Sequence, residues 1–202
     1  KEYIKQGKNV EWDISDVNIF TPDAITLFAA CFNDPNYKKG LMRGNHPKND
    51  EVRKIFVESG FHDFVCCDER LKCHSNHKSN YKVQGTVARD ACKYGVAHVF
   101  GNYKDVQELY EMLVEAMSNT NNHAAGKDKE GEIKWWLYTC NSNNELTSYS
   151  FVDLGVGIFD SAPFNLFKRI STRLRVKCNA DYIPKLLSGE IGSRKEYEHN
   201  VR

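Results

Sequence analysis

The chain has 202 residues, of which 41% are hydrophobic and 27% charged, a composition that is typical of a globular protein and excludes wholesale disorder. The 28 Lys and Arg residues nearly balance the 27 Asp and Glu residues, so the net charge of +1 provides no broad basic surface for a nucleic acid or an anionic membrane. The longest apolar run, residues 25–32, is far shorter than the roughly 20 residues of a membrane span. We therefore expect neither a nucleic acid nor a membrane as a partner.

The N-terminal third of the chain predicts alternating strands and helices. Residues 10–14 alternate apolar and polar side chains, as a half-buried strand does. Thr21 and Pro22 form a helix-start signal with Thr21 as the cap, and the mostly apolar run behind them predicts a helix to residue 32. Further elements are expected in this third: a short strand at 40–42, a helix at 50–59 that ends at Gly60, and a strand at 61–66.

Residues 68–80 are the most polar stretch of the chain, and we interpret them as a candidate linker. Apolar residues then recur at helical spacing over 104–119, which predicts an amphipathic helix. The other elements expected after the linker are a strand at 81–87, two strands at 132–140 and 146–154 joined by a polar turn, and one or two helices within 164–187.

Seven cysteines are spread irregularly, unlike the regular framework of a secreted disulfide-bonded protein. Residues 1–5 contain no apolar signal core, so we expect reduced thiols and a cytoplasmic protein. One group of thiol and imidazole side chains offers the ligands that zinc prefers, but it lacks the two pairs of closely spaced ligands that are typical of a structural zinc site. We favour a loop with incidental Cys and His and keep a zinc site and a redox role as alternatives; the group is Cys66, Cys67, Cys73, His74 and His77.

The helix expected at 104–119 leads into the first segment suited to chemistry. Glu115 and Asn119 are four residues apart and share one helix face, and His123 lies a further turn along the same face. A carboxylate can act as a general base toward water, and an amide oxygen is a hard ligand that suits Mg²⁺. Taken alone, such a pair is also typical of a solvated helix face.

The second such segment is a hydrophobic strand that runs into Asp153-Leu-Gly155-Val-Gly157. An Asp at a strand end can accept a hydrogen bond from a ligand amine, and the two glycines let the backbone turn tightly and approach a ligand. A dinucleotide fingerprint would need a small residue where the chain has Asp160, and a helix directly behind it, so we reject that interpretation. Taken alone, the segment is also typical of a tight turn.

The order of these features, a helix, a loop, a two-strand hairpin and then Asp-x-Gly-x-Gly, resembles the Bergerat-fold (GHKL) ATPases, which include the histidine kinases and the type II topoisomerases. Glu115-x-x-x-Asn119 matches the family's N box, and Asp153-Leu-Gly155-Val-Gly157 matches the box that holds adenine. The stretch 115–124 is closest to the anti-sigma-factor serine kinase branch. The resemblance implies an α/β fold of the α+β sandwich type, with a mixed sheet and a helical layer.

The resemblance also implies roles for individual residues. Asn119 would chelate the Mg²⁺ that bridges the ATP phosphates, Glu115 would be the catalytic general base, and Asp153 would accept a hydrogen of the adenine amino group. The other residues implied in the ATP site are Gly155 and Gly157 at the adenine and Asn122, His123 and Lys127 at the phosphates or ribose. A later glycine box of the G-x-G-L kind does not occur before Arg202, so we expect the phosphate site of this chain to lack it.

The N-terminal part carries a weaker resemblance to STAS domains. Residues 10–30 resemble the opening strand, turn and helix of such a domain, and Asn45-x-Pro47 and residues 56–61 resemble its later strand and helix. We therefore expect a STAS-like α/β unit at 1–75 and a GHKL ATPase domain at 76–202. The family's phosphorylatable Ser or Thr sits at the first helix start, which makes Thr21 a candidate phosphoacceptor, although we favour its role as a cap.

The expected function is that of a Mg-ATP-binding protein that acts as an ATPase or as a protein serine/threonine kinase-like switch in signalling. The alternative is a non-catalytic module that senses the nucleotide and binds a partner. ATP and Mg²⁺ are the expected cofactors. A protein partner and a homodimer are further expectations that follow from the resemblance.

Overall fold

The described residues form a mixed α/β structure with two sheets, a parallel pair in the order β1-β2 and an antiparallel sheet in the order β3-β4-β5. This computed structural model describes residues 9–33, 42–66, 76–125, 133–142 and 145–157. In chain order the elements are β1 (Val10–Trp12), α2 (Pro22–Asn33), β2 (Met42–Gly44), α3 (Asp50–Glu58), α4 (Phe61–Cys66), β3 (His77–Asn80), α5 (Gly85–Phe100), α6 (Gln107–His123), β4 (Trp135–Ser142) and β5 (Leu146–Asp153). A fold that mixes helices and sheets is therefore confirmed.

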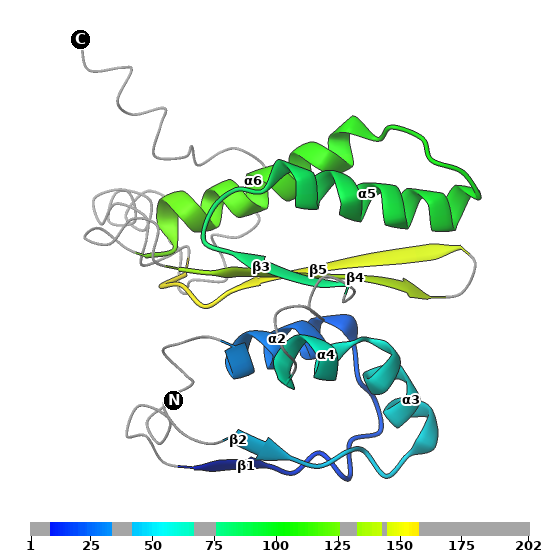
Figure 1. Ribbon diagram of the computed structural model, residues 1–202, viewed down its shortest axis with the longest axis vertical. Coiled ribbons are helices and arrows are strands. Elements are labelled where there is room, and N and C mark those ends of the chain that lie inside the picture. The colour runs from blue at the N-terminus through cyan, green and yellow to red at the C-terminus, as the bar shows by residue number, and fades with distance from the viewer. Residues whose placement is uncertain (1–8, 34–41, 67–75, 126–132, 143–144, 158–202) are drawn as a thin grey trace, which may run out of the picture.

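The elements are stacked in layers. Figure 1 shows α5 and α6 above the three-stranded sheet, α2 and α4 below it, and the β1-β2 pair at the bottom. Side chains of β4 alternate between the two faces of its sheet. Trp135 and Leu137 pack into a cluster with α5 and α6, whereas Trp136 and Tyr138 pack into a second cluster with α2. Both faces of β4 are therefore covered by helices.

The cluster below the sheet contains side chains from both of the expected domains. Ile25 of α2 and Phe56 of α3 lie in the same cluster as Trp136, and Val152 and Leu154 at the end of β5 pack against it. Residues 9–66 thus supply the apolar cover for the lower face of the sheet. The boundary at residue 75 stays a prediction. None of the described helices is long and apolar enough to cross a membrane.

Several of the expected N-terminal elements are confirmed. β1 lies within 10–14. β2 is Met42–Gly44 and shares only residue 42 with the strand expected at 40–42, whose positions 40 and 41 lie outside the described residues. α2 begins at Pro22, where the hydroxyl of Thr21 accepts a hydrogen bond from the Ala24 N–H at 3.3 Å, so Thr21 acts as the expected cap. α3 ends before Gly60, whose φ of 73° is the left-handed conformation that favours glycine.

The strand expected at 61–66 is wrong, because these residues form helix α4. A short apolar run does not distinguish a buried strand from a buried helical turn by periodicity alone. Here Phe61 and Val65 both pack into the cluster below the sheet, whereas Asp63 between them is exposed. A strand would turn all three side chains to one face, and a helical turn does not. Packing against α2 and α3 therefore decides the conformation of this segment.

The strand expected at 81–87 is also wrong, since the strand is β3 at His77–Asn80 and α5 begins at Gly85. The side-chain oxygen of Asn80 accepts hydrogen bonds from the N–H groups of Tyr81 and Lys82, at 2.7 and 3.1 Å. Such an Asn turn ends the strand and redirects the chain toward the helix. The candidate linker at 68–80 therefore ends in a strand of the sheet, while its residues 68–75 lie outside the described part.

The expected helix and hairpin of the C-terminal half are confirmed. α6 covers most of the helix expected at 104–119 and continues to His123. β4 and β5 match the strands expected at 132–140 and 146–154 and pair antiparallel, with Trp135 opposite Asp153. The helices expected within 164–187 lie outside the described residues.

Candidate functional site

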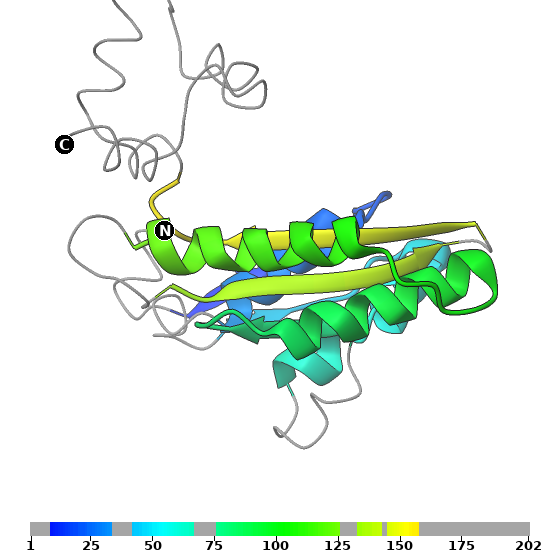
Figure 2. The same cartoon turned by 90° about the horizontal axis from the view of Figure 1, so that it is seen from above.

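The last turn of α6 lies against the end of β5, and this junction is the candidate site. Figure 2 shows α5 and α6 side by side over one face of the sheet. The buried positions of α6 and its cap follow a stripe with spacings of four, three and four residues, which is the period of a helix face turned toward a core. The stripe consists of Leu113, Met117, Thr120 and Ala124. Its two C-terminal members reach the turn that follows β5.

Asp153 is an exposed residue whose carboxylate is held from two sides. The hydroxyl of Thr120 donates to Oδ2 at 3.1 Å, and the backbone N–H of Gly155 donates to Oδ1 at 3.0 Å. The N–H of Val156 donates to the carbonyl of Ala124 at 2.9 Å, which ties the turn to the end of α6. The two segments that the sequence singled out therefore meet directly.

The two glycines of the turn are required for different structural reasons. A Cβ at Gly155 would lie 2.5 Å from the Cβ of Ala124 and 2.6 Å from its carbonyl oxygen, so only glycine allows this close approach. Gly157 has a φ of 83°, a conformation that L side chains rarely adopt, and no atom lies within 4 Å of a Cβ built there. The first glycine thus serves packing and the second serves the backbone turn.

Four of the other expected site residues lie on the C-terminal half of α6: Glu115, Asn119, Asn122 and His123. Glu115 and Asn119 are both exposed, and Asn119 directly precedes the Thr120 that contacts Asp153. His123 is half-buried at the end of the helix. Asn122 donates from its side-chain amide to the hydroxyl of Ser118 at 3.1 Å. The amide oxygen of Asn119 is thus open to solvent and suited to a hard cation, while Lys127 lies outside the described residues.

Of the group considered for zinc, His77 is a core residue. It is 2% exposed, and its ring stacks on that of Tyr138 with 4.2 Å between the ring centroids. Burial lowers the pKa of His77 to about 3, against a hydrogen bond to the Ser59 backbone that acts in the opposite direction. The described part of the chain contains no group of three or more metal-ligating side chains, and Cys67, Cys73 and His74 lie outside it.

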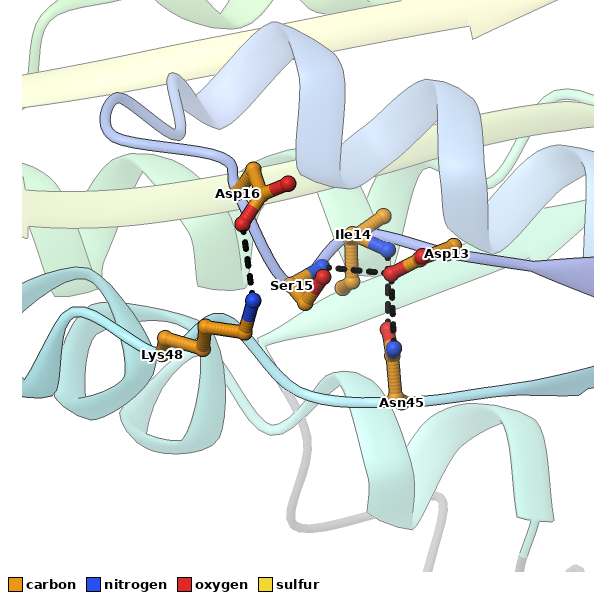
Figure 3. A network of polar contacts seen from close by, with 6 residues as sticks. All are labelled: Asp13, Ile14, Ser15, Asp16, Asn45 and Lys48. Carbon is orange, nitrogen blue, oxygen red and sulfur yellow. Dashed lines mark hydrogen bonds and ion pairs between the residues drawn. The ribbon is translucent and has the colours of Figure 1, made fainter.

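A separate polar network joins the ends of the parallel strands β1 and β2 (Figure 3). The carboxylate of Asp13 accepts hydrogen bonds from the side-chain amide of Asn45 at 2.7 Å and from the Ser15 N–H at 3.0 Å. The amide oxygen of Asn45 in turn accepts from the Ile14 N–H at 2.8 Å. These bonds, led by that from Asn45, lower the pKa of Asp13 to about 2. Because these hydrogen bonds join the segments that follow β1 and β2, we interpret the network as a structural link between the two loops.

Sequence reasoning missed two residues of the site, Thr120 and Ala124. Both lie within the N-box segment, but no role was expected for either. The available signal was the spacing of the buried stripe, on which Thr120 is a polar residue among apolar ones. A polar side chain on a core-facing stripe needs a hydrogen-bond partner, and besides the carbonyl of Ala116 in its own helix, Thr120 has Asp153, 33 residues away in the chain.

Comparisons of the sequence with protein-family models, with curated proteins and with solved structures give no match. What supports the site is accordingly the set of contacts around Asp153 and the order of the two motifs along the chain.

Proposed function

We propose that the chain binds Mg-ATP at the junction of α6 and the β5 turn, in the manner of a Bergerat-type (GHKL) ATPase domain. The observation that carries this proposal is the contact between α6 and the end of β5: Thr120 donates to Asp153 at 3.1 Å, and the N–H of Val156 donates to the carbonyl of Ala124 at 2.9 Å. The segment 115–124 and the segment that contains Asp153 thus contact each other through Thr120 and Ala124. The exposed carboxylate between them is an acceptor that fits an aromatic amine.

The chemistry of the residues suits the roles that the resemblance implies. Asp153 accepts hydrogen bonds only, so it favours a purine that presents an amino group over one that presents a carbonyl. The absence of a side chain at Gly155 lets the turn lie against α6. Mg²⁺, when bound, neutralises phosphate charge, and the exposed amide oxygen of Asn119 is suited to hold it.

Glu115 would be the catalytic base of an ATPase or of a serine/threonine kinase-like switch. Its carboxylate is exposed one helical turn before Asn119, where it can take a proton from water or from a substrate hydroxyl. A protein partner is part of this proposal, since a kinase-like switch acts on one.

A non-catalytic nucleotide sensor is the second candidate function, and one observation favours it. Val152 and Leu154 flank Asp153 in the chain, and both pack against the cluster that residues 9–66 form together with Trp136 and Tyr138 of β4. A ligand bound to Asp153 therefore acts on the end of β5, where the neighbouring side chains pack against residues 9–66. Such an arrangement suits a module that transmits nucleotide occupancy to residues 9–66.

Asp153→Asn tests the nucleotide site. We expect this change to weaken Mg-ATP binding by about tenfold or more, because an amide presents its own N–H donors to the adenine amine and a hydrogen bond to a charged group is lost. Isothermal titration of the full chain with Mg-ATP measures the effect, and Asp90→Asn on the exposed face of α5 is the matched control. Equal affinity in the wild type and Asp153→Asn, or no binding by the wild type, would overturn the proposal.

Glu115→Ala separates the two candidate functions. A general base is needed for turnover and not for binding, so we expect the variant to retain Mg-ATP affinity and to lose phosphate release or transfer by roughly 100-fold or more. Steady-state phosphate release measures the turnover rate, and titration of the same preparation with Mg-ATP measures the affinity. A wild-type chain that binds Mg-ATP without any turnover would favour the sensor.

A further inference from the structure

We propose that Thr120 is a positioning residue, which orients the carboxylate of Asp153 so that it recognises the amino group of a purine. This inference rests on the proposed function, and it assigns a role that neither the N box nor the adenine box implies. It starts from the hydrogen bond of 3.1 Å between the Thr120 hydroxyl and Asp153 Oδ2.

The direction of this hydrogen bond follows from the acceptors around Thr120. Its hydroxyl lies 3.1 Å from Asp153 Oδ2 and 3.2 Å from the carbonyl oxygen of Ala116, and it has one hydrogen to donate. A carboxylate is the stronger acceptor, and hydrogen bonds to ionised groups are stronger than those to neutral ones. The hydroxyl therefore donates to Asp153.

The two donors together determine how the carboxylate is turned. A carboxylate at an exposed strand end would otherwise rotate about its broad terminal torsion. The Gly155 N–H holds Oδ1 from the turn, and Thr120 holds Oδ2 from the helix, so the plane of the group is set. Each oxygen has a second lone pair, which is left to accept from a ligand.

The rigidity of the second donor distinguishes Thr120 from a surface hydroxyl. Thr120 is 2% exposed and lies on the buried stripe of α6, so the packing around it restricts its side chain to one conformation. The orientation of Asp153 is therefore set before any ligand arrives, which lowers the entropy lost on binding. Removing the hydroxyl while keeping the shape would free the carboxylate without emptying the core.

Thr120→Val removes the donor and keeps the branched shape of the side chain. We compare Mg-ATP with the Mg complex of purine riboside triphosphate, which carries hydrogen in place of the exocyclic amino group. The variant is expected to bind Mg-ATP about tenfold more weakly and purine riboside triphosphate with unchanged affinity. Thr120→Ser, which restores a hydroxyl, is expected to regain most of the Mg-ATP affinity.

Thr26→Val is the matched control. Thr26 is a buried helix threonine of α2 whose hydroxyl donates to the carbonyl of Pro22 at 2.8 Å, four residues earlier, and not to Asp153. We expect it to leave both affinities unchanged.

The outcomes separate this inference from the proposed function. If the wild-type chain does not bind Mg-ATP, or if Asp153→Asn binds it equally well, the nucleotide site itself is wrong. If the wild type binds and Thr120→Val weakens both nucleotides equally, Thr120 only maintains the fold, and the positioning role is overturned. Unchanged affinity for both nucleotides in Thr120→Val overturns it as well. Loss of Mg-ATP affinity alone, with recovery in Thr120→Ser, supports it.

Discussion

Lowering the pH from 7 to 5 is expected to reduce the free energy of unfolding by about 2 kcal/mol through His77 alone. His77 is 2% exposed and stacked on Tyr138, and burial lowers its pKa from 6.5 to about 3. In the unfolded chain the same imidazole takes up a proton below pH 6.5, so the unfolded state binds more protons than the folded state. The stabilisation is therefore fully present above about pH 6.5 and is lost as the pH falls toward 3.

Urea unfolding at several pH values between 5 and 8 measures this effect. His77→Phe keeps a ring that can stack on Tyr138 and removes the titrating group, so the stability of this variant should depend much less on pH. His62→Gln is a useful control, because burial and the neighbouring His46 also lower the pKa of His62, but its ring is only half-buried. We expect that control to keep most of the slope. A slope in His77→Phe equal to that of the wild type would contradict the prediction.

Gly155→Ala is expected to separate the β5 turn from α6 and to weaken nucleotide binding. The new Cβ would lie 2.5 Å from the Cβ of Ala124 and 2.6 Å from its carbonyl oxygen, closer than real Cβ atoms come. Neither contact is the end of a flexible side chain, so rotation about a side-chain bond does not relieve it. The turn must move, which breaks the hydrogen bond from Val156 to Ala124 and draws Asp153 away from Thr120.

We expect this variant to lose roughly 1–3 kcal/mol of unfolding free energy, as is typical of overpacking, and to bind Mg-ATP at least about tenfold more weakly. Urea unfolding and titration with Mg-ATP measure the two effects. Gly101→Ala is the control for backbone strain, because Gly101 has a φ of 70° and nothing within 4 Å of a Cβ, and it ends α5 away from the site. Gly155→Ala with wild-type stability and affinity would show that the turn does not need its contact with α6.

The elements that the sequence predicted correctly are those with a strong local pattern. The helix at 104–119 has apolar residues at helical spacing, and the hairpin strands show their own apolar runs on either side of a polar turn. Gly60 after a helical stretch and Thr21 before one are local signals whose physical cause lies within a few residues. In such segments tertiary packing reinforces the local preference.

The two segments predicted wrongly lacked such a pattern. Phe61–Cys66 is six residues long, and its apolar side chains fit a strand or a helical turn equally well until they meet the core. A strand was expected at 81–87, but the side chain of Asn80 accepts from the two N–H groups that follow it and ends the preceding strand. The long helix α5 was not expected at all, and no side chain caps its beginning.

For the candidate site, the sequence by itself determined which residues carry suitable chemistry, since Glu115, Asn119 and Asp153 were recognised from residue type and spacing. The tertiary structure alone decided that Thr120 donates to Asp153, that Gly155 lies against Ala124 and that residues 9–66 cover the second face of the sheet. The reason is physical: side-chain chemistry and helical or strand periodicity are local properties of the chain. A hydrogen bond across 33 residues, or the choice of which helix covers a sheet face, depends on how those elements pack.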